Sequence, residues 1–100
     1  PLSLLEKEWS MDNEQAFFVL LRERIFSESG FERVLDLLYS IDFSSQTMID
    51  RRWVALLWYM PIFIEQQMEG LVYQGAKKEK LEHARCKIVN RLEEILGLPQ

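Results

Sequence analysis

The chain has 100 residues, 48% hydrophobic, 12% aromatic and 28% charged, which supports one hydrophobic core and a single domain over residues 1–100 and excludes the disordered, collagenous and low-complexity classes. The net charge of −4 is uneven: residues 1–50 carry four Lys and Arg against ten Asp and Glu, a charge of −6, whereas residues 51–100 carry +2. An acidic half argues against nucleic-acid binding, which needs clustered Lys and Arg, and suits a basic protein partner.

Apolar residues at spacings of three and four predict an all-α protein, a compact bundle of five or six helices. The first helix is predicted over residues 1–9. A second helix should be capped by Ser10 or Asp12, whose side-chain oxygens can accept amide protons of the first turn, and should run to about Ser27. It is apolar on nearly every side, which predicts burial on several faces.

Gly30 interrupts the helical pattern, and Ser29 with Glu32 three residues later is typical of the capping box that begins a third helix. Four apolar residues form its inward stripe: Phe31, Val34, Leu35 and Leu38. Glu32 and Asp36 lie four residues apart on the other side, so both carboxylates should face solvent. A polar loop over residues 40–46 then carries two apolar anchors, Ile41 and Phe43.

A fourth helix should begin at a cap on Thr47 or Asp50. Its predicted inward residues are Ile49, Trp53, Leu56, Leu57 and Met60. Pro61 has no amide proton and its ring crowds the preceding turn, so the helix must bend or end there. The apolar period resumes at Ile64, Met68, Leu71 and Val72, which favours a kinked helix that continues to Gly75.

The aromatic residues of this fourth helix cannot all share one face. Trp53 and Trp58 are separated by about 140° around a helix. Either one of Trp53, Trp58 and Tyr59 is exposed and available for binding, or the helix is buried all round.

A last helix is predicted over residues 77–96, with Leu81, Ala84, Ile88, Leu92 and Ile95 inward, and Gly97 as its termination signal. Glutamates interrupt its basic residues, which are Lys77, Lys78, Lys80, Arg85, Lys87 and Arg91. This pattern indicates a mixed-charge exposed helix rather than a nucleic-acid-binding arm.

Reactive side chains are scarce. The chain has one histidine and one cysteine, so we expect no intramolecular disulfide, no closed zinc site and a reducing compartment such as the cytosol. His83 and Cys86 could form a thiol and base pair, but both lie off the apolar stripe and should be surface residues. Lys80 stands where a carboxylate di-metal motif would need Glu. We therefore predict no catalytic, metal-binding or cofactor-binding residue, and a protein that is not an enzyme.

Membrane insertion and export are not predicted. The longest apolar run, Trp53–Ile64, has 12 residues and contains Pro61, whereas a membrane-spanning helix needs about 20. Residues 1–9 include Glu6, Lys7 and Glu8, where a signal peptide would be apolar.

Acidic residues bracket two aromatic residues between positions 28 and 50. Carboxylates beside aromatic rings can bind a cationic active site or an Arg or Lys side chain. The predicted partner-binding residues are Glu28, Glu32, Asp36, Tyr39, Asp42, Phe43 and Asp50. Two alternatives remain: the acidic residues are only a solvated helix face, or the chain is an adaptor or regulatory module that acts through its apolar fourth helix, possibly as a homodimer.

The segment Asp50-Arg51-Arg52-Trp53 leads into Leu57-Trp58-Tyr59-Met60-Pro61 within a compact, acidic, cysteine-poor helical chain. In this general build the chain resembles the small immunity proteins of bacterial contact-dependent growth inhibition systems. The resemblance implies a cytosolic protein that binds a cognate toxin domain, often a nuclease, and covers its basic substrate cleft. It assigns no role to an individual residue.

Overall fold

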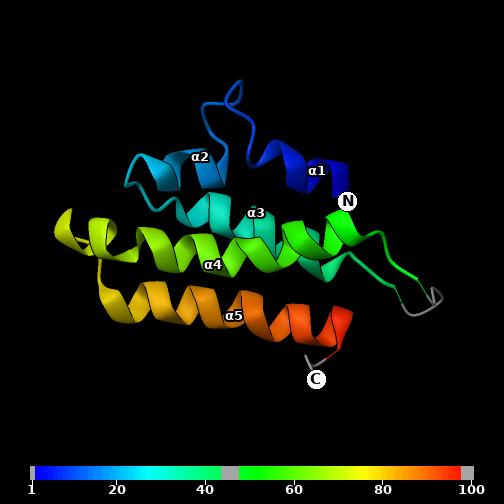
Figure 1. The fold of residues 1–100 in the computed structure, drawn as a ribbon. Coiled ribbons are helices and arrows are strands. Elements are labelled where there is room, and N and C mark those ends of the chain that lie inside the picture. The colour runs from blue at the N-terminus through cyan, green and yellow to red at the C-terminus, as the bar shows by residue number, and fades with distance from the viewer. Residues whose placement is uncertain (1, 44–47, 98–100) are drawn as a thin grey trace.

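Five helices and no strand occur in the residues that the structure, a computed structural model, describes: 2–43 and 48–97. The helices are α1 (Leu2–Lys7), α2 (Phe17–Arg22), α3 (Glu28–Tyr39), α4 (Arg51–Tyr73) and α5 (Lys78–Leu96). α4 and α5 run side by side, while α1 and α2 lie above α4 and α3 lies behind it in the view of Figure 1. The all-α prediction is confirmed.

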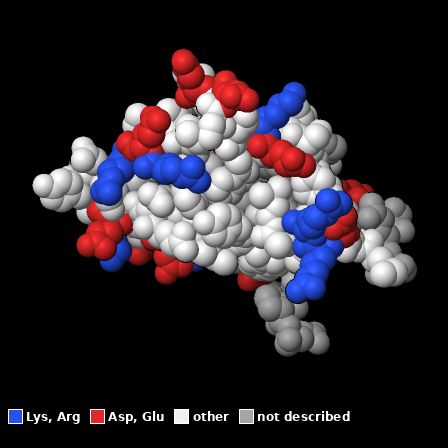
Figure 2. Space-filling model, turned by 45° about the horizontal axis from the view of Figure 1, so that its top comes forward, with Lys and Arg blue, Asp and Glu red and all other residues white. Residues whose placement is uncertain are grey.

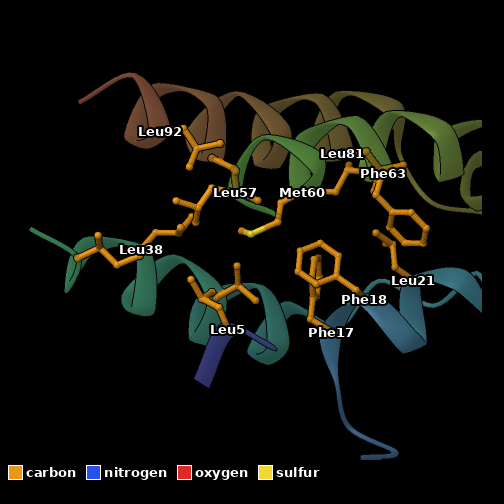
Figure 3. Packing of buried hydrophobic residues seen from close by; sticks show 14 of the residues in the cluster. Leu5, Phe17, Phe18, Leu21, Leu38, Leu57, Met60, Phe63, Leu81 and Leu92 are labelled. Atoms are coloured by element: carbon orange, nitrogen blue, oxygen red, sulfur yellow. The ribbon is translucent and has the colours of Figure 1, made fainter. Parts of the chain in front are cut away.

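Side chains from all five helices meet in one hydrophobic core, as Figure 3 shows. α2 contributes Phe17, Phe18 and Leu21, which point toward α4, and each of these three side chains is at most 1% exposed. Fully burying one side chain of this size contributes about 2 kcal/mol. The burial predicted for the second helix on several faces is therefore confirmed, because Val19 is buried as well.

The second helix is much shorter than predicted, and the caps predicted on Ser10 and Asp12 are wrong. α2 begins only at Phe17, and the residue before it, Ala16, makes no side-chain cap. Ser10 Oγ instead accepts the Asp12 amide proton at 3.3 Å within the turns that precede α2. Such short polar side chains favour turns because they bond to the backbone two residues on.

Glu8, nine residues before Phe17, takes the place of the missing cap. Its Oε1 accepts the amide proton of Phe17 at 2.9 Å, and its carbonyl oxygen accepts that of Phe18 at 3.0 Å. Arg33 of α3 donates Nε to Glu8 Oε2 at 3.1 Å and Nη2 to Glu8 Oε1 at 3.0 Å. These bonds tie the end of α1, the start of α2 and the middle of α3 together.

α3 begins two residues earlier than the predicted capping box. Ser27, not Ser29, is its cap, and Ser27 Oγ accepts the amide proton of Gly30 at 3.0 Å. Gly30 is buried inside the first turn, where an added Cβ would lie 3.3 Å from Phe17 Cβ. The glycine therefore allows α3 to approach Phe17 closely rather than ending a helix. The predicted apolar stripe of α3 is confirmed in part: Val34 and Leu38 are fully buried and Phe31 packs against the core, whereas Leu35 is half-buried and lines a surface groove.

α4 continues through Pro61, as predicted, and is 23 residues long. Asp50 is its cap; the alternative cap, Thr47, lies outside the described residues. Leu57, Met60 and Ile64 are fully buried, but Val72, predicted inward, is 40% exposed. Among the three aromatic residues of uncertain orientation, Tyr59 is the exposed one.

α5 matches its prediction closely. Its buried residues are Leu81, Ala84, Ile88 and Leu92, and Gly97 ends it with a φ of 83°, a conformation that glycine adopts without strain. None of the described helices combines the length and the hydropathy that crossing a lipid bilayer requires.

Candidate functional site

Four of the seven predicted partner-binding residues lie along one exposed face of α3. Glu28, Glu32, Asp36 and Tyr39 are spaced four, four and three residues apart, and all four are exposed. Side chains at these spacings share one side of a helix because 3.6 residues complete a turn. We call these four residues the α3 stripe. The position of the stripe follows from the opposite face of α3, where Val34 and Leu38 enter the core.

The carboxylates of the α3 stripe differ in how far they are neutralised. Glu28 forms an ion pair with Lys80 of α5. Glu32 and Asp36 form no ion pair with the described residues, and one turn of helix, about 5.4 Å of rise, separates them. The middle of the stripe therefore presents two exposed carboxylates that are not engaged in an ion pair with the described residues.

A surface groove of about 410 Å³ runs beside the α3 stripe, between α3 and α5. Glu28 and Glu32 line it from α3, and Lys80, His83 and Lys87 line it from α5. Apolar atoms of Phe26, Phe31, Leu35 and Ala84 complete its lining. The groove thus combines an acidic side, a basic side and apolar surface, a combination that suits a protein segment with both charged and apolar side chains.

Arg91 of α5 contacts the end of the α3 stripe. The sequence did not indicate this contact. Its guanidinium lies 4.8 Å from the centre of the Tyr39 ring. It also donates to three backbone carbonyls at the end of α3: Leu38 at 3.0 Å, Tyr39 at 3.3 Å and Ile41 at 3.0 Å. A cation that bonds the last carbonyls of a helix satisfies acceptors that have no partner within the helix. Arg91 was predicted as one of several exposed basic residues, and this reading is wrong, because its side chain is only 16% exposed.

Asp42 and Phe43 lie beyond this end of α3. They line a second groove together with Tyr39 and Arg91. Asp42 is exposed, whereas Phe43 is half-buried and packs against the core. Phe43 is therefore a structural anchor, as the loop pattern predicted, with only part of its ring available to a partner.

Asp50 lies apart from the α3 stripe, at the start of α4. Its Oδ1 accepts the amide proton of Arg52 at 2.9 Å, and its Oδ2 pairs with Arg52 Nη2 at 3.0 Å. The side-chain hydrogen bond from Arg52, aided by the backbone one, lowers the pKa of Asp50. Because capping α4 and pairing with Arg52 engage both carboxylate oxygens, Asp50 has less capacity for a partner than Glu32 or Asp36.

The two reactive side chains singled out in the sequence both lie on the surface, as predicted. Cys86 is exposed, and His83 is exposed and lines the groove beside the α3 stripe. In the part of the chain that the structure describes, no three His, Cys, Asp or Glu side chains are grouped so that they could hold a metal ion.

Comparison of the chain with protein-family models, with curated proteins and with solved structures found no match.

Proposed function

We propose that this protein binds a basic protein partner through the α3 stripe, and that it acts as a cytoplasmic bacterial immunity protein that neutralises a cognate toxin domain. The observation that carries the proposal is the clustering of Glu28, Glu32, Asp36 and Tyr39 on one exposed face of one helix. The resemblance to immunity proteins of contact-dependent growth inhibition systems supplies the kind of partner.

Charge is the physical reason for this choice of partner. A nuclease toxin needs a basic cleft to bind phosphate groups. The α3 stripe offers two carboxylates that form no ion pair with the described residues, Glu32 and Asp36, within the half of the chain that carries a charge of −6. A rigid helix that presents such charges can occupy the cleft in place of nucleic acid, so that the substrate is excluded.

The aromatic end of the stripe adds a contact of a different kind. Tyr39 is 57% exposed, and Arg91 holds its ring from one side. A tyrosine fixed in this way can bury a large area against a partner with little loss of conformational freedom. Tyr39 is therefore the residue of the stripe that we expect to contribute most apolar contact.

The test begins with the gene immediately upstream, which should encode a secreted protein that ends in a toxin domain, and continues with binding of this toxin domain to the protein, both purified. We expect a stable complex and inhibition of the toxin. Replacing Glu32→Lys together with Asp36→Lys should weaken the complex by about a hundredfold, because two attractive charges become repulsive against a basic surface.

Asp12→Lys with Glu14→Lys is the matched control. Both residues are exposed, lie in the same acidic half and form no ion pair with the described residues, so the change of net charge is identical. Equal weakening by both double variants would show that only net charge matters and would remove the stripe from the interface. Failure to form any complex with the toxin domain would refute the proposed function.

A further inference from the structure

The bundle leaves most of the outer face of α4 exposed, with apolar residues in its middle and charged residues toward its ends. Its residues are spaced four, three, four, three and four apart: Arg51, Ala55, Trp58, Ile62, Glu65 and Glu69. Trp58 is half-buried and the other five are exposed. We call these six residues the α4 seam. An average spacing of 3.5 residues keeps one side of a helix against a second helix over several turns.

The middle of the α4 seam is apolar, and an ordered aromatic ring, Tyr59, lies beside it. Ile62 is 48% exposed, and Tyr59, beside the seam, is 42% exposed. The Trp9 ring stacks on Phe18 at 4.0 Å and on Tyr59 at 5.5 Å between ring centres, so the core fixes these rings in place. Figure 2 shows that the middle of the face above and in front of α4 is mostly uncharged, with charged side chains gathered toward its edges. Aromatic surface that is already ordered loses little entropy when it is covered.

The charges of the α4 seam are segregated along the helix. Arg51 is at its start, and Glu65 and Glu69 are in its second half. None of these three forms an ion pair with the described residues, in contrast to the neighbouring Arg52, which pairs with Asp50. A second α4 seam aligned in parallel would place like charges opposite one another, whereas an antiparallel one would place basic opposite acidic.

We infer that two copies of this protein associate through their α4 seams, packed antiparallel about a two-fold axis. The register follows from the spacing: when Trp58 of one copy faces Ile62 of the other, Ala55 faces Glu65 and Arg51 faces Glu69. Two-fold symmetry repeats each contact, so the two Trp58–Ile62 contacts are flanked by two Arg51–Glu69 ion pairs. The α4 seam and the α3 stripe share no residue, so the dimer and the proposed partner binding can fail or succeed independently.

Sedimentation equilibrium of the full chain tests the dimer. We expect the wild-type protein to change from monomer to dimer as its concentration rises to about 1 mM. Ile62→Asp should abolish the dimer, and circular dichroism should show an unchanged helix content because the side chain is half-exposed. A wild-type protein that stays monomeric throughout would overturn the inference and leave the seam to a different partner.

Charge exchange tests the register. In a dimer of the Arg51→Glu variant, two acidic side chains face each other at positions 51 and 69. In a dimer of the Glu69→Arg variant, two basic side chains do so. Each variant should therefore raise the dimer dissociation constant by about tenfold. An equal mixture of the two variants should restore wild-type association. The Arg51→Glu copy is acidic at positions 51 and 69 and the Glu69→Arg copy is basic at both, so opposite charges face each other in the mixed dimer. Glu14→Arg, an exposed charge reversal away from α4, should leave association unchanged. A mixture that associates no better than either variant alone would overturn the antiparallel register.

Discussion

The guanidinium of Arg33 holds the buried carboxylate of Glu8 against the start of α2. Glu8 is 5% exposed, and its two oxygens accept hydrogen bonds from Nε and Nη2 of Arg33 and from the Phe17 amide. Arg33 Nη2 also donates to the carbonyl of Gln15 at 2.8 Å, and the hydrogen bond to Glu8 raises the pKa of Arg33. One ion pair thus fixes the long turn between α1 and α2 on the surface of α3.

Replacing Glu8→Ala should lower the free energy of unfolding by about 2 kcal/mol, because the Phe17 amide loses its acceptor and Arg33 loses its partner. Urea unfolding followed by circular dichroism measures this. Glu14→Ala, an exposed glutamate in the same turn, should change the free energy by less than about 0.5 kcal/mol. An equal decrease in the free energy of unfolding in the two variants would show that the Glu8 carboxylate does not stabilise this turn.

The position of the α3 cap can be tested with two neighbouring serines. Ser27→Ala should destabilise the protein by about 1 kcal/mol, because the Gly30 amide loses the oxygen that accepts it. Ser29→Ala should have little effect, since its hydroxyl contacts only Ser27 Oγ among the described residues. Thermal unfolding of the two variants and the wild type measures the difference in stability. A larger loss in Ser29→Ala would restore the capping box predicted from the sequence.

Arg91→Met should lower the free energy of unfolding by about 1–3 kcal/mol, because the carbonyls of Leu38 and Ile41 lose a charged donor. Hydrogen exchange should also become faster at the end of α3 than elsewhere in that helix. Arg85→Met on the same helix is the control, since Arg85 makes no hydrogen bond or ion pair with the described residues. Uniform exchange rates in Arg91→Met would contradict the capping role.

The lowered pKa of Asp50 predicts a defined dependence on pH. A carboxyl group whose pKa is lower in the folded state stabilises that state above its ordinary pKa near 3.8, and this contribution disappears as the pH falls through the lowered folded-state value. Asp50→Asn keeps an acceptor for the Arg52 amide but loses the charge. The wild type should therefore be the more stable protein at neutral pH, and the difference should shrink in acid. If the difference in free energy of unfolding between the two proteins stayed constant from neutral pH to below the folded-state pKa, ionised Asp50 would not be its source.

Partner binding through the α3 stripe should depend on salt mainly in its association rate. Raising the ionic strength screens exposed charges such as Glu32 and Asp36 and should slow association, with less effect on dissociation. Stopped-flow mixing with the proposed toxin partner at several salt concentrations measures both rates. An association rate that does not vary with salt would point to apolar contact as the main source of recognition.

The candidate site was only partly predictable. The spacing of Glu32 and Asp36 was enough to place them on one outer face of α3, because the apolar residues of a helix determine which side turns inward. That Lys80 would neutralise Glu28, or that Arg91 would hold Tyr39, was not predictable. Each of these contacts spans about fifty residues of chain and depends on how α5 is rotated against α3.

The sequence alone determined the helical class, the inward faces of α3 and α5, the continuation of α4 past Pro61 and the end of α5 at Gly97, because hydrophobic periodicity and termination signals act within a few residues. The tertiary structure decided where α2 and α3 begin and which charges remain free. At α2, Glu8, held by Arg33 of another helix, supplies the acceptor that Phe17 needs. Such a partner is fixed by packing, and only folding brings the two groups together.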